Sequence, residues 1–186
     1  MTGPLLDEKI LAIRRQLVDR NIPHAFGGAL ALAYYATPRG TEDIDIKIFV
    51  PASEADRVLG PLAELGVARA TAADRTRLRR DGQVRVHWGR TPLDLFFSYD
   101  ALHEACRPRS RTVAFGSDEI EILSAEDLVV FKVLFDRDKD WVDIGHLLFA
   151  MEGEFDAEYV TGWLGRIVEV DDARQARFEE LLASAS

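Results

Sequence analysis

Two closely spaced carboxylates that follow a pair of glycines constrain this chain more than any other feature. Residues 43–48 alternate polar and apolar side chains, which predicts a strand with one face in the core. On that strand Asp43 and Asp45 share a face, where two negative charges about 6 to 7 Å apart cost about 2 to 3 kcal/mol at an effective dielectric constant of about 20. A fold that keeps them together must therefore offset this repulsion. Either the face is solvated and Lys47 neutralises part of the charge, or a cation binds between the carboxylates.

The two glycines favour a bound cation with a phosphate. Gly27 and Gly28 end the apolar run His24-Ala25-Phe26 and precede a short alanine-rich segment with helical propensity. Glycine lets a backbone turn approach a phosphate closely, and a helix that begins there directs its N–H groups to the same place. Asp94, on another predicted strand, adds a third carboxylate. Three carboxylates suit two Mg²⁺ ions about 4 Å apart, an arrangement that supports in-line phosphoryl transfer.

Composition restricts the protein class. The chain has 186 residues, 47% of them hydrophobic, which is enough for one good core. The single cysteine, Cys106, excludes an internal disulfide, and no apolar run is long enough to cross a bilayer or to serve as a signal peptide. We therefore expect a soluble, cytoplasmic protein. The formal net charge of -9 argues against sequence-independent nucleic-acid binding, although a local basic patch would still allow it to bind RNA ends or nucleotides.

The hydrophobic pattern predicts a mixed chain that ends in helices. The predicted helices before residue 123 span residues 5–18, 29–35 and 54–64. Strands are expected at 25–26, 43–48, 75–80, 83–88, 93–97, 111–115 and 119–122. If residues 75–80 form a strand, Arg75, Arg77 and Arg79 make a positive row on one face, which is either a solvated face or a surface for an anionic acceptor such as RNA. From Ser124 the pattern changes to helices at 125–135, 139–151, 157–168 and 172–183.

At this point the sequence resembles the nucleotidyltransferases of the DNA polymerase beta superfamily. Their pattern is an apolar residue, Gly, then Gly or Ser, a spacer, and an Asp-x-Asp or Asp-x-Glu flanked by apolar residues. Here it reads Phe26-Gly27-Gly28 and Asp43-Ile44-Asp45, with a somewhat longer spacer than in the shortest members. Gly28 replaces the serine that many members place on the phosphate, which leaves that contact to the backbone.

The resemblance covers residues 20 to 123 and implies roles for the carboxylates. Asp43 and Asp45 would bind both Mg²⁺ ions, and Asp94 would bind the ion that activates the acceptor hydroxyl. The implied fold class is α/β (α+β), with a mixed-sheet nucleotidyltransferase core flanked by helices in residues 1–123 and a C-terminal helical bundle in residues 124–186. Arg39 and Thr41, just before the carboxylates, are candidate nucleotide-binding residues, although Arg39 is equally well explained as a solvated loop arginine.

A later segment, residues 132–144, resembles the Lys-then-Arg-x-Lys-Asp-x-x-Asp motif of the AbiEii-type nucleotidyltransferase-like toxins of type IV abortive-infection systems. Asp140 and Asp143 would share one face of a helix. This resemblance implies that Lys132, as a catalytic residue, and Lys139 bind nucleotide phosphates, that Asp140 has an orienting role, and that a cognate antitoxin exists. The alternative is a charged linker between two helices, with Asp140 capping the second.

Together these features predict a Mg²⁺-dependent nucleotidyltransferase that moves an NMP from an NTP such as ATP to an acceptor hydroxyl and releases pyrophosphate. The acceptor is an RNA 3′ end, for example of tRNA, or a small molecule such as an aminoglycoside. The net charge favours a cationic antibiotic, and the arginine row favours RNA. A non-catalytic binding or antitoxin module is the alternative from another class, but it gives no reason to keep three mutually repelling carboxylates.

Overall fold

The computed structural model describes residues 3–169 and 172–185. The described residues form two compact units. The first comprises those of Met1–Gly28 and Gly40–Leu123, and the second comprises those of Ala29–Arg39 and Ser124–Ser186. The chain therefore passes from one unit to the other after Gly28, after Arg39 and after Leu123.

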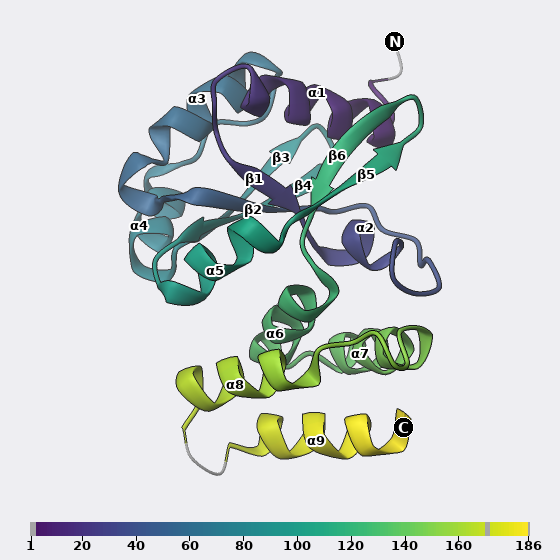
Figure 1. Cartoon of the computed structure of the whole chain (residues 1–186). Helices are drawn as coiled ribbons and strands as arrows, with labels where there is room; N and C mark the ends of the chain where they lie inside the picture. Colours follow the sequence, from purple (N-terminus) through teal and green to yellow (C-terminus); the bar gives the residue numbers. More distant parts are fainter. Residues whose placement is uncertain (1–2, 170–171, 186) are drawn as a thin grey trace. The chain divides into compact units, whose positions relative to one another are not determined.

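A six-stranded mixed sheet forms the centre of the first unit, with the strand order β3-β4-β2-β1-β6-β5 (Figure 1). The strands are β1 (His24–Phe26), β2 (Ile44–Pro51), β3 (Gln83–Trp88), β4 (Thr91–Ser98), β5 (Arg111–Phe115) and β6 (Asp118–Ile122). β2 runs parallel to β4 and antiparallel to β1, and β1 is parallel to β6. The mixed sheet confirms the predicted fold class, and each of these strands was expected from its residue pattern.

Helices cover both faces of this sheet. α1 (Leu6–Val18) and α3 (Asp56–Glu64) lie on one face, and α5 (Ala101–Arg109) lies on the other (Figure 1). Ile44, Ile46 and Ile48 of β2 are at most 1% exposed, so the apolar face of this strand lies in the core, as its alternation predicts. The first unit also contains the 3₁₀ helix η1 (Ala52–Glu54) and α4 (Ala72–Asp81), whereas α2 (Gly28–Leu32) begins at the last residue of its first segment and otherwise belongs to the second unit. α5 was not expected from the sequence.

The predicted strand over residues 75–80 is wrong, because these residues belong to α4 (Ala72–Asp81). Thr71 begins the helix with a capping box, in which its hydroxyl accepts from the Asp74 N–H at 3.2 Å and its own N–H donates to the Asp74 carboxylate at 2.9 Å. Gly82, at φ +67°, ends the helix in the left-handed conformation. These end signals outweigh the short alternation of arginine with Thr76 and Leu78.

The expected arginine row therefore does not exist. Successive helical residues are rotated by about 100°, so Arg75 and Arg79 share a side of α4 while Arg77 points elsewhere. Arg75 pairs with Asp56 of α3 at 2.6 Å. The helix thus disperses the charges that a strand would have aligned.

The second unit is built on α6 (Ala125–Phe135), α7 (Asp138–Ala150), α8 (Ala157–Ile167) and α9 (Ala173–Ala185), within a few residues of the predicted helices. Ser124 caps α6 by accepting from the Asp127 N–H at 3.2 Å. The buried core of these helices includes Leu128, Val129, Val133, Trp141, Leu147, Val160, Leu164 and Phe178. Within residues 3–169 and 172–185, no helix combines the length and the apolar character needed to cross a membrane.

Candidate active site

Sheet register brings the three predicted carboxylates to one face of the first unit. Asp45 on β2 lies directly opposite Asp94 on the parallel strand β4. Paired residues on neighbouring strands share a face, and Asp43, two residues before Asp45, belongs to the same face. The Asp43 and Asp94 side chains are 36% and 17% exposed, so both are open to solvent.

Arg85 on β3 completes this cluster. Its Nε donates to Asp94 Oδ1 at 2.7 Å and its Nη2 donates to Asp94 Oδ2 at 2.6 Å. The same Nη2 lies 3.7 Å from Asp43 Oδ2. Hydrogen bonding to Asp94 raises the pKa of Arg85 further above its usual range, so the guanidinium stays charged. One cation therefore faces two of the three carboxylates.

Sequence reasoning missed Arg85, although a signal for it exists. Gly89 and Arg90 form a two-residue turn between Trp88 and Thr91, which pair with each other. This tight turn fixes the hairpin register and places Arg85 opposite Asp94. The predicted strands over residues 83–88 and 93–97 leave a four-residue connection between them, and that register does not place Arg85 opposite Asp94.

The two glycines have different surroundings. The Gly27 N–H donates to the Asp45 carbonyl at 2.9 Å, so this amide already has a backbone hydrogen-bond partner. Gly28 has φ +55°, and a Cβ atom there would overlap the Asp45 carboxylate. Glycine at position 28 therefore gives Asp45 the space for its side chain.

Thr41 stabilises the entry into β2. Its hydroxyl accepts from the Asp43 N–H at 3.2 Å and lies 3.3 Å from the Asp43 carbonyl oxygen. The short Thr side chain thus fixes the backbone of the first carboxylate. Nucleotide binding by Thr41 stays a prediction.

The donor set fits Mg²⁺ in its chemistry. Carboxylate oxygens are the ligands that Mg²⁺ prefers, and the missing side chain at Gly28 leaves the space that the Asp45 carboxylate occupies. In the part of the chain that the structure describes, no three His, Cys, Asp or Glu side chains are already gathered as a metal-binding group. Asp94 is instead engaged by Arg85.

The predicted residues of the second unit form a separate ionic network. Lys132 on α6, 3% exposed, donates to Asp143 Oδ2 at 2.6 Å and to Asp140 Oδ1 at 3.3 Å. Arg39 donates through Nε to Asp143 Oδ1 at 2.9 Å, and Arg137 donates through Nε to Asp140 Oδ2 at 2.5 Å. The two carboxylates are buried, and each is held by two cations.

This network explains the charge pattern of the 132–144 segment. Burial alone would raise the pKa of Asp143, but hydrogen bonds from Arg39 and Lys132 outweigh that effect and lower it. Arg39 therefore forms an ion pair with a buried carboxylate, while its own side chain is 37% exposed. Lys139 is exposed on the first turn of α7. The nucleotide-binding roles implied for Arg39, Lys132, Lys139 and Asp140 stay predictions.

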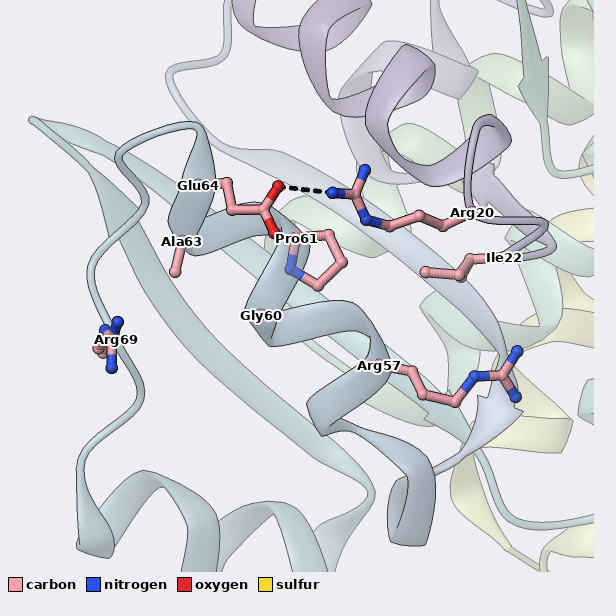
Figure 2. A pocket seen from close by; sticks show the side chains of 8 residues that line it. All are labelled: Arg20, Ile22, Arg57, Gly60, Pro61, Ala63, Glu64 and Arg69. Atoms are coloured by element: carbon pink, nitrogen blue, oxygen red, sulfur yellow. Dashed lines mark hydrogen bonds and ion pairs between the residues drawn. The ribbon is translucent and has the colours of Figure 1, made fainter.

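The first unit also has a cavity of about 630 Å³, and Figure 2 shows the side chains that line it. Arg20, just beyond α1, pairs there with Glu64 of α3 at 2.5 Å. None of the predicted site residues lines this cavity, whose lining consists of Arg20, Ile22, Arg57, Gly60, Pro61, Ala63, Glu64 and Arg69.

No family model and no curated protein matches this sequence. Solved structures do match. The solution structure of the antibiotic-resistance factor ANT(2'')-Ia is similar with a TM-score of 0.56 and 17% identity, over 96% of this chain and 89% of that chain. The lincomycin-bound lincosamide antibiotic adenylyltransferase LnuA has a TM-score of 0.54 and 13% identity, over 78% of this chain and 98% of that chain. The chain therefore has a nucleotidyltransferase fold.

Proposed function

We propose that this protein is a Mg²⁺-dependent nucleotidyltransferase that transfers an NMP from an NTP to an acceptor hydroxyl. The observation that carries the proposal is the register of β2 with β4, which sets Asp45 opposite Asp94 beside Asp43. The carboxylates share one sheet face in a fold that is similar to an antibiotic adenylyltransferase. The AbiEii-type role and a cognate antitoxin stay predictions from the sequence.

The reaction requires positioning and charge neutralisation. The acceptor oxygen forms a bond to the α-phosphorus, the bond from that phosphorus to the oxygen bridging to the β-phosphorus breaks, and pyrophosphate leaves. The acceptor proton passes to solvent. Asp43 and Asp45 would hold both Mg²⁺ ions and Asp94 would hold one of them. Bound Mg²⁺ would neutralise phosphate charge and acidify the acceptor hydroxyl.

The chain itself contributes a rigid frame for this chemistry. The Gly27 N–H holds the backbone of Asp45 by donating to its carbonyl, and the missing side chain at Gly28 leaves space for the Asp45 carboxylate. Thr41 holds the backbone of Asp43. Pre-ordered carboxylates on adjacent strands lower the entropic cost of aligning the acceptor with the α-phosphate.

Two observations favour a small hydroxylated acceptor over an RNA 3′ end. The formal net charge is -9, which attracts a cationic small molecule and repels nucleic acid. The arginine row that favoured RNA is absent, because Arg75, Arg77 and Arg79 lie on α4. An aminoglycoside is such an acceptor, because it is a small molecule with several hydroxyls and a positive charge.

The test is label transfer from each α-labelled NTP in the presence of Mg²⁺, with an aminoglycoside panel and a tRNA pool as separate acceptors. We expect transfer to a small cationic acceptor that stops when EDTA is added. Asp45→Asn should lower the rate by about 100-fold or more, because a metal ion supplies several kcal/mol of transition-state stabilisation.

Asp7→Asn, an exposed change on α1, is the matched control and should leave the rate unchanged. A rate for Asp45→Asn within a few-fold of the parent would refute the metal assignment. Transfer only to tRNA would refute the small-molecule acceptor, and no transfer in any mixture would favour the binding module.

A further inference from the structure

The guanidinium of Arg85 holds Asp94 in a forked pair that the fold does not require. Both Asp94 oxygens accept from Arg85, at 2.7 and 2.6 Å, and Asp43 lies 3.7 Å from the same guanidinium. β3 is an edge strand of the sheet, and the Arg85 side chain is 49% exposed. Its charged end therefore contributes little to the core.

A divalent cation at Asp94 would compete for the same oxygens. A carboxylate accepts a forked arginine through one lone pair on each oxygen, and the guanidinium then stands where a metal ion would approach. Exposed ion pairs are weak because water screens them, so a divalent ion can displace this arginine. The half-exposed side chain has solvent into which it can turn.

We propose that Arg85 is a built-in counter-cation, which neutralises Asp94 and Asp43 and must release Asp94 before a divalent ion binds there. The inference rests on the proposed function, since it concerns the same carboxylates. It explains how Asp43 and Asp94 can lie close together on one sheet face. It also makes Arg85 a positioning residue that sets the metal affinity.

The experiment is a Mn²⁺ titration of the nucleotide-free protein, in which electron paramagnetic resonance measures the free ion. Arg85→Met should bind Mn²⁺ about fivefold more tightly than the parent, because the competing exposed pair is gone. Arg85→Lys should fall between the two, since lysine keeps the charge but lacks the fork. Arg90→Met removes the same charge from the exposed hairpin turn and should leave the affinity within twofold.

The outcomes separate this inference from the proposed function. If Arg85→Met binds Mn²⁺ as the parent does, or more weakly, while Asp45→Asn loses binding, the metal site stands and the role of Arg85 is wrong. If neither the parent nor Arg85→Met binds Mn²⁺, the inference and the metal-dependent function fail together. A melting curve of each variant checks folding, and Arg85→Gln serves the same test should Arg85→Met not fold.

Discussion

Gly28 is required both by its backbone conformation and by its contact with Asp45. It has φ +55°, and a Cβ atom would overlap the carboxylate of Asp45. We expect Gly28→Ala to lower the free energy of unfolding by about 1 to 3 kcal/mol, because alanine is strained at positive φ and Asp45 must move. Urea unfolding measures the stability, and the Mn²⁺ titration reports the displaced carboxylate.

Gly40→Ala is the matched control, because a Cβ atom at Gly40 meets nothing within 4 Å. It should change the free energy of unfolding by less than about 0.5 kcal/mol. Equal losses in the two variants would show that the contact with Asp45 does not matter.

Single residues show where sequence reasoning ends. The spacing of Asp43 and Asp45 predicted their shared face, because strand alternation is a local property. The pair of Arg85 with Asp94 depends on the length of a turn, and an error of two residues in that turn hides it. Gly28 was expected to make room for a phosphate, whereas the structure shows first that it makes room for Asp45.

At the scale of elements, the packing of α5 against β2 buries Lys47. The strand alternation offers Lys47 as a neutralising neighbour of the two aspartates, but in the structure Lys47 is 2% exposed. Its Nζ donates to the Phe96 carbonyl at 3.1 Å and contacts His103 Nδ1 on α5. Burial lowers the pKa of Lys47 from 10.5 to about 7. The helix that buries this lysine carries no strong amphipathic pattern, so its packing could not be predicted.

The buried lysine predicts a pH dependence of stability. Between pH 7 and 10.5 the unfolded chain binds a proton at Lys47 that the folded chain does not, so the free energy of unfolding should rise with pH in this window. The contribution is up to about 1.4 kcal/mol per pH unit. Urea unfolding from pH 7 to pH 10 should show this rise in the parent and a flatter curve in Lys47→Met.

Lys139→Met replaces an exposed lysine and should keep the slope of the parent. Parallel curves for the parent and Lys47→Met would mean that Lys47 is charged in the folded protein.

For the whole molecule, the proposed function predicts stabilisation by its ligands. A ligand that binds only the folded state at 100 times its dissociation constant adds about 2.7 kcal/mol. For a chain of this length, Mg²⁺ with the preferred nucleotide should therefore raise the melting temperature by roughly 5 to 10 °C. Scanning calorimetry with each NTP, with and without Mg²⁺, measures the shift. Asp45→Asn should abolish the Mg²⁺-dependent part.

The overall fold could be predicted because its signals are local or belong to the resemblance. Strand alternation, helix caps and the Gly-Gly and Asp-x-Asp pattern together indicated a mixed sheet followed by helices. The partner of Arg39 could not be predicted, because Asp143 lies 104 residues further along the chain. Nothing in the local pattern around Arg39 distinguishes a solvated arginine from one that is paired across that distance.

The path of the chain between its two units limits which segments this protein can exchange with a relative. The chain passes between its compact units after Gly28, after Arg39 and after Leu123, so the helical unit includes a segment from the N-terminal third. A chimaera joined at Leu123 would take residues 124–186 from a relative. It would keep Arg39 of this chain but lose Asp143, the partner of Arg39. Viable chimaeras with relatives should therefore exchange residues 29–39 together with the C-terminal helices, and the two segments should be inherited as one block.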